Sequence, residues 1–193
     1  STLLREPVEV TGAGRTDTGV HAAYAVAHFD VAAPLTDPEH TAYKLNCLLP
    51  DDVAVFGVTP VADDAHARFS AAEREYRYFI ESRKNPFTRR AAWHYYRPLD
   101  VERMDRAAAS LLEYDDFTSF AKLNNKTNIC RIVRAGWEES PEGVYRFTIR
   151  ADRFLRNMVR ALVGTLVDVG RGRYDVEEFR AIVESRDLSR ASG

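Results

Sequence analysis

The residues best suited to chemistry lie in one short stretch near the start of the sequence, residues 12–22. It reads Gly-Ala-Gly-Arg-Thr-Asp-Thr-Gly-Val-His-Ala, and its three glycines allow tight turns and close approach of the backbone to a ligand. Asp17 is its single carboxylate, and Arg15 lies two residues before it. A guanidinium beside a carboxylate keeps it ionised and oriented, which suits a nucleophile better than a general acid. Arg15 is equally suited to binding a phosphate.

Other interpretations of this stretch stay open. Loops rich in Gly, Thr and Asp are commonly turns, and an Arg-x-Asp pair is commonly a surface contact. The spacing lacks the third glycine of the dinucleotide-binding fingerprint, and there is no Gly-Lys-Ser/Thr as in a P-loop. A hydrolase built on Asp17 and His21 is a further alternative. However, the stretch has no second carboxylate to complete an acid/base pair, and a lone loop histidine is commonly structural.

Length and composition describe an ordinary globular chain. The 193 residues predict one large domain or two small ones that share a core, and 45% hydrophobic with 29% charged residues is typical of a soluble protein. No apolar run approaches the roughly 18 residues that span a bilayer, and the start has no signal-peptide pattern. The two cysteines, Cys47 and Cys130, lack metal-ligand spacing. We therefore expect a cytoplasmic protein without a metal site.

The charge pattern is more informative than the net charge of −2, which does not suggest a nucleic-acid binder. Arginines cluster within residues 68–97 and again within 146–160, whereas acidic residues concentrate at 37–39, 138–142 and 175–178. This pattern predicts a bipolar surface whose basic parts bind phosphate. For any single arginine, a solvated side chain remains the simpler interpretation.

Hydrophobic patterning predicts an α+β fold with a mostly antiparallel sheet and helices on one side. The expected strands are 7–11, 23–31, 53–61, 72–80, 129–137 and 143–151, the last two forming a hairpin. Both faces of 23–31 are apolar, which predicts a central strand covered on both sides. The expected helices begin near residues 37, 100, 154 and 175. We expect residues 83–99 to be a connection, with a strand inside it as one alternative. Residues 122–128 are expected to be a polar loop, for which a plain surface loop is the simpler interpretation and RNA contact through its lysines the alternative.

Four stretches, in this order, resemble motifs of the TruA family of tRNA pseudouridine synthases. They are residues 14–22, then 66–71 leading to 74–78, then 116–120, then 154–160 with Gly164. The resemblance implies two ferredoxin-like halves that share a mostly antiparallel sheet, with the catalytic cleft between them. Residues 1–82 would be the N-terminal half with the catalytic loop, 83–99 the connection and 100–193 the C-terminal half.

The resemblance also implies a reaction. The expected activity is isomerisation of uridine to pseudouridine in the anticodon stem-loop of tRNA, at nucleotide positions 38–40, with no cofactor and no metal. By the same resemblance, Asp17 is the nucleophile and Tyr76 stacks on the target base. Arg15 and Arg160 are candidates for substrate binding and for orienting Asp17, and we expect an ion pair between Arg160 and Asp17.

By the same resemblance, the expected partners are tRNA and a second copy of the chain in a homodimer, without a membrane. The candidates for RNA contact are Arg68, Arg77, Arg156 and His21. Family members usually carry one more strand before the first segment and one more after the last helix, and neither is present. We therefore expect a chain shortened at both ends. The alternative function is a catalytically incomplete fragment that only binds RNA.

Overall fold

The computed structural model describes residues 3–122 and 127–192. Within it the chain forms two compact units, Ser1–Ala71 and Ala72–Gly193. Residues 83–99 therefore belong to the second unit, and the expected division at residues 82 and 99 stays a prediction. Most of the polar loop expected at 122–128 lies outside the described residues, together with Lys126.

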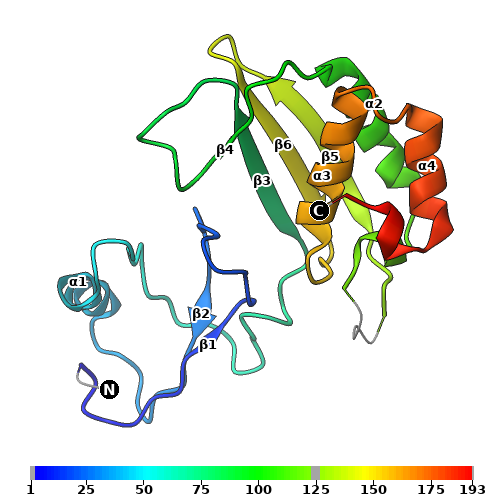
Figure 1. Cartoon of the computed structure of the whole chain (residues 1–193). Coiled ribbons are helices and arrows are strands. Elements are labelled where there is room, and N and C mark those ends of the chain that lie inside the picture. Colours follow the sequence, from blue (N-terminus) through cyan, green and yellow to red (C-terminus); the bar gives the residue numbers. More distant parts are fainter. Residues whose placement is uncertain (1–2, 123–126, 193) are drawn as a thin grey trace. The chain divides into compact units, whose positions relative to one another are not determined.

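The first unit holds a small antiparallel sheet and one helix (Figure 1). Strand β1 (Thr11–Gly12) pairs with β2 (Ala27–His28), and helix α1 spans Pro38–Leu48. Asp37 begins this helix, because its Oδ1 accepts the backbone N–H of His40 at 2.9 Å. Pro38 occupies the first turn, where its missing N–H costs nothing. The predicted helix is confirmed.

The long strands expected in this unit are wrong. Residues 7–11 and 23–31 contribute only the two-residue β1 and β2, and Tyr24 is 79% exposed rather than covered on both sides. Residues 53–61 form no strand. Their one strand-like pairing is to a side chain, since the Asn46 amide donates to Val55 O at 2.8 Å and accepts Val55 N–H at 2.7 Å. Apolar alternation yields a strand only where a neighbouring strand is present to pair with it.

The second unit contains a four-stranded sheet in the order β4-β3-β6-β5. Strand β6 (Val144–Ala151) lies antiparallel between β3 (Arg74–Glu81) and β5 (Ile132–Glu139), and β4 (Trp93–His94) pairs in parallel with β3. Strands β3 and β5 are thus parallel with β6 between them, which is a split βαβ arrangement. The expected hairpin and the strand within 83–99 are confirmed.

The α+β class is confirmed. Among the described residues the strands form two sheets, one in each unit. The description as two ferredoxin-like halves that share a sheet therefore stays a prediction.

Helices α2 (Val101–Ser110), α3 (Met158–Gly170) and α4 (Val176–Ser185) cover one face of the larger sheet (Figure 1). Strand β6 supplies the centre of this core, since Phe147 and Ile149 are fully buried. The intervening side chains of the sheet lie on the opposite face. There they form ion pairs, which are Arg146–Glu138, Arg134–Glu138, Arg77–Glu75 and Arg150–Glu73.

Two of the three helix starts in this unit agree with the sequence. Asp100 caps α2, and Asp175 with Glu178 forms a capping box at α4. The third is wrong, because α3 begins at Met158 and not near Phe154. Asn157 has a left-handed backbone with φ 69°, which separates Phe154 from the helix. None of the helices in the described ranges has the length and apolar character needed to cross a bilayer.

Because the two faces of the sheet differ in burial, we expect removal of an aromatic ring to lower the free energy of unfolding by very different amounts on each face. Phe147→Ala should lower the free energy of unfolding by about 3–5 kcal/mol, because Phe147 is fully buried. Phe79→Ala, on the opposite face and 36% exposed, should cost about 1 kcal/mol or less. Denaturant unfolding followed by tryptophan fluorescence measures both, since Trp93 and Trp137, the two tryptophans of the chain, lie in this unit. Equal costs for the two variants would contradict this assignment of faces.

Candidate active site

Asp17 lies on a tight turn within the loop that joins β1 to β2. The Val20 N–H donates to Asp17 O at 3.2 Å, and Gly19, at the third position of this turn, has φ +86°. A type II turn requires positive φ at that position, which glycine adopts without strain. Ala13 N–H donates to Val26 O at 3.0 Å and closes the base of the loop. The turn therefore holds Asp17 at an exposed loop end.

Arg15 and His21 flank this turn and are also exposed. Among the described residues, Arg15 forms no ion pair within 4.0 Å. Roles for Arg15 and His21 toward a bound substrate stay predictions.

Arg68 lies on a second tight turn of the first unit, and this turn is fastened to β2. His28 on β2 accepts the Ala67 N–H at its Nδ1, at 3.0 Å. His66 Nδ1 accepts the Arg68 N–H at 3.1 Å, and the His66 N–H donates to Ser70 Oγ at 2.9 Å. The His28 bond joins the Arg68 turn to β2, the strand that follows the Asp17 loop, and the His66 bonds hold the turn itself.

Tyr76 lies on β3, on the face that carries the helices. It is half-buried against the core, and its ring meets the Phe154 ring edge-to-face with centroids 5.0 Å apart. Arg77 points to the other face, where it is ion-paired with Glu75 at 2.9 Å. The structure therefore places these two predicted site residues on opposite faces of the sheet.

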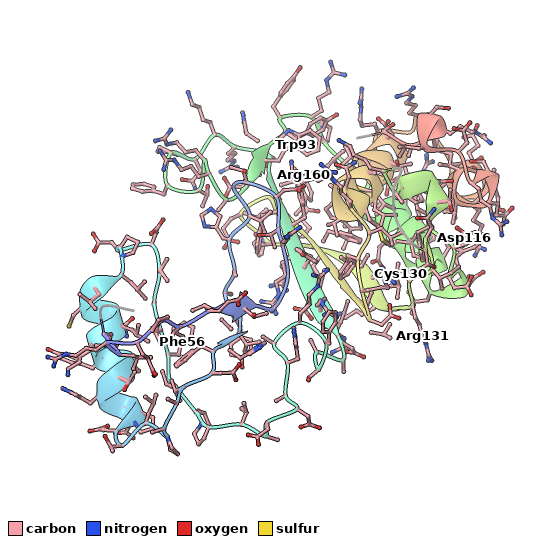
Figure 2. The ribbon with its side chains drawn as sticks, turned by 90° about the horizontal axis from the view of Figure 1, so that it is seen from below. Phe56, Trp93, Asp116, Cys130, Arg131 and Arg160 are labelled. Atoms are coloured by element: carbon pink, nitrogen blue, oxygen red, sulfur yellow. The ribbon has the colours of Figure 1, made fainter. Side chains whose placement is uncertain are left out.

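Arg156 lies just before the N-cap residue of α3 and Arg160 lies in the first turn of this helix, and both are exposed. Figure 2 shows Arg160 on this helix. Asn157 provides no side-chain cap for α3. The N–H groups of the first turn, which also holds Arg160, therefore keep the positive partial charge of a helix N-terminus. The region has the polarity that favours an anion, and the roles of both arginines stay predictions.

Comparison of the sequence with known proteins identifies the family of the chain. The profile of a family described as tRNA pseudouridine synthase matches residues 2–70 and 107–193. The chain is 51% identical to tRNA pseudouridine synthase A of Bacteroides fragilis, over 99% of this chain and 77% of that protein. It is 54% identical to the enzyme of the same name from Bacteroides thetaiotaomicron, over 99% and 72%, and 42% identical to that of Bacillus subtilis, over 97% and 76%.

The chain belongs to the tRNA pseudouridine synthase family. It is therefore an isomerase, since pseudouridine contains the atoms of uridine with the base attached through C5 instead of N1. The Asp17 and Arg68 turns, with Arg156 and Arg160, lie inside the segments that the family profile matches. Tyr76 and Arg77 lie between those segments.

In this pseudouridine synthase, the motif at 116–120 is a packing element. Phe117 and Phe120 are fully buried, and Ser119 Oγ donates to Ile182 O at 2.6 Å in α4. Asp116 Oδ1 accepts both the N–H and the hydroxyl of Thr118, and these hydrogen bonds lower the pKa of the Asp116 carboxyl. The carboxylate is thus held in its ionised form for a structural purpose.

The two cysteines differ sharply in reactivity. Cys47 is exposed on α1, whereas Cys130 is buried and its Sγ donates to Arg153 O at 2.8 Å. Burial raises the pKa of the Cys130 thiol to about 12, so it stays protonated at neutral pH. Among the described residues, no three His, Cys, Asp or Glu side chains gather as metal ligands.

Sequence reasoning missed two supporting residues. Phe154 was expected on the apolar side of a helix, but it contacts Tyr76 instead. A lone histidine in a strand gives no signal of its own in the sequence, so the hydrogen bond that His28 accepts from the Ala67 N–H is visible only in the fold. His66 precedes Arg68 by two residues, and this local spacing is the one sequence feature that hints at its Nδ1 bond.

The turn that carries Asp17 predicts a contrast between two nearby glycines. Gly19→Ala should cost about 1 kcal/mol or more, because alanine is strained at φ +86°. Gly14→Ala is the matched control, since neither glycine has an atom within 4 Å of an added Cβ and Gly14 has no positive φ. Hydrogen exchange of the Val20 amide should be about five- to tenfold faster in Gly19→Ala and unchanged in Gly14→Ala. Unchanged exchange in both would contradict the turn described here.

Proposed function

We propose that this chain converts uridine to pseudouridine in the anticodon stem-loop of tRNA, at positions 38–40, with Asp17 as its nucleophile. The observation that carries the proposal is the presentation of Asp17 on an exposed turn, within a segment matched by the tRNA pseudouridine synthase family. The names of the similar proteins support tRNA as the substrate class.

The reaction needs only acid, base and nucleophilic chemistry. The N1–C1′ bond of uridine breaks, the uracil turns, and C5 bonds to C1′. The C5 proton then leaves and N1 ends protonated, so no electrons are exchanged. The target base must leave its stack to reach a carboxylate, and the detached uracil must stay bound while it turns. Asp17 supplies the carboxylate, acting at the sugar C1′ or at the ring C6.

The other site residues receive the roles that the family resemblance implies. Tyr76 offers an aromatic face on which the uracil stacks. Arg160 pairs with and orients Asp17, and Arg15 binds substrate phosphate. The RNA backbone is held by Arg68, Arg77, Arg156 and His21. We further propose that the protein works as a homodimer in the cytoplasm, without a cofactor.

Replacement of the nucleophile gives the first test. Asp17→Asn should reduce pseudouridine formation on an unmodified tRNA transcript by at least about a thousandfold, because an amide is no nucleophile at this reaction. Asp30→Asn, an equal change of charge at another exposed position of the first unit, should leave the rate unchanged. Mass spectrometry of the digested tRNA, after derivatisation specific for pseudouridine, measures the product.

Binding of the same transcript separates the possible outcomes. Retained tRNA affinity with no product from the unchanged chain would overturn the proposal and leave RNA binding alone as the function. Full activity of Asp17→Asn would overturn only the assignment of the nucleophile.

Tyr76 gives a second test. Tyr76→Phe keeps the stacking face and the edge-to-face contact with Phe154 and should keep most of the activity. Tyr76→Leu keeps an apolar side chain but removes the aromatic face, so the rate at saturating tRNA should fall about fivefold or more. Far-UV circular dichroism and thermal unfolding establish that both variants are folded. An equal rate in the two variants would argue against base stacking on this ring.

A further inference from the structure

Residues 83–97, here called the basic arm, are the most one-sided stretch of the chain in charge. Its fifteen residues contain five cations and four aromatics but no Asp or Glu, in a chain whose net charge is −2. The arm lies between the two segments matched by the family profile. The site described above uses none of the arm's residues, so it does not explain this composition.

The arm is ordered, because hydrogen bonds at its base attach it to the larger sheet. Glu81, at the end of β3, accepts the Thr88 hydroxyl at its carboxylate at 2.7 Å and the Tyr95 N–H at its backbone oxygen at 2.9 Å. Within the arm, the N–H groups of Ala91 and Ala92 both donate to Thr88 O. Strand β4 then pairs with the end of β3. A ligand of the arm therefore binds a segment that is already ordered, so its binding free energy is not reduced by the entropy of ordering that segment.

The cations of the arm are not neutralised by the protein. All five are exposed, and none forms an ion pair with a carboxylate among the described residues. This sets them apart from Arg77, Arg146 and Arg150 on the sheet, each of which is paired with a glutamate. The set comprises Arg83, Lys84, Arg89, Arg90 and Arg97.

The aromatic rings of the arm are presented to solvent beside these cations. Phe87 is 96% exposed and Tyr96 is 71% exposed. The Arg97 guanidinium carbon lies 5.7 Å from the centroid of the Tyr96 ring. The Tyr95 ring, also in the arm, stacks on the Tyr96 ring with centroids 6.4 Å apart. Figure 2 shows side chains of the arm standing out from the ribbon around Trp93. Exposed rings interleaved with unpaired cations form the surface that stacks nucleic-acid bases and tracks phosphates.

We propose that the basic arm is a second RNA-contacting surface, which binds tRNA phosphates through Arg89, Arg90 and Arg97 and stacks an unpaired base on Tyr96. The inference rests on the proposed function for its choice of RNA. A contact between two copies of the arm across a two-fold axis would bring like charges together, which disfavours that occupant. Phosphate supplies the negative charge that the arm lacks.

Charge neutralisation tests the phosphate contacts in the full chain. In Arg89→Gln/Arg90→Gln, the Kd for an unmodified tRNA transcript should rise about tenfold, and the slope of log affinity against log salt should fall by about 1.5, as for two lost phosphate contacts. The matched control is Arg103→Gln/Arg106→Gln, two exposed arginines on the outside of α2. Its Kd and slope should stay close to those of the unchanged chain. Equal losses in the two double variants, or none in the first, would overturn the proposal.

The stacking contact has its own pair of variants. Tyr96→Leu should raise the Kd about fivefold, whereas Tyr96→Phe should keep the wild-type value. Equal Kd values in Tyr96→Leu and Tyr96→Phe would overturn the stacking contact. Sedimentation of the same variants tests the competing occupant: a loss of dimer with an unchanged Kd would make the arm a contact between copies and overturn the proposal.

Binding is measured without turnover, so the two proposals fail separately. If the unchanged chain forms no pseudouridine but the arm variants lose tRNA affinity as stated, the arm inference stands and the proposed function does not. If pseudouridine forms and depends on Asp17 while the arm variants bind normally, the arm inference alone is wrong.

Discussion

Strand β6 must satisfy two different environments at once, and the second unit is built around that constraint. Its side chains alternate between a helix-covered core, with Phe147 and Ile149, and an ion-paired face, with Arg146 and Arg150. A slip of one residue in its pairing would place arginines in the core and rings in water. Because β6 pairs on both edges, with β3 and β5, it also fixes which way Tyr76 and Arg77 point.

The first unit is held together by a different kind of force. Its sheet has two short strands, and several of its apolar side chains are exposed, so burial contributes little. Its order depends instead on hydrogen bonds to backbone groups: those of Asp37 at α1, of Asn46 at Val55, and of His28 and His66 at the Arg68 turn. In each of these bonds a side chain, rather than the backbone of a neighbouring strand or helical turn, is the partner of a backbone group. Bonds of this kind fix the conformation of short turns, among them the turn that carries Arg68.

The sequence predicted the parts of the fold whose signals are local. The caps at Asp37, Asp100 and Asp175, the hairpin of β5 and β6, and the Asp17 turn all follow from residues close together in the chain. It failed where the outcome depends on distant partners. Residues 53–61 alternate like a strand but lack a neighbouring strand, and the left-handed Asn157 delays α3 beyond Phe154. For the candidate site, family motifs identified residues, but the support given by His28 and Phe154 required the fold.

The contrast between the two thiols has a practical consequence for spectroscopy. Cys47 is exposed in the first unit, and Cys130 in the second is buried, hydrogen-bonded and protonated at neutral pH. A maleimide dye therefore attaches to α1 alone without any substitution, since the reactive species is an accessible thiolate. Both tryptophans lie in the other unit. The unaltered protein thus offers tryptophan donors in one unit and a single dye-labelling position in the other, so energy transfer between the two units can be measured without any substitution.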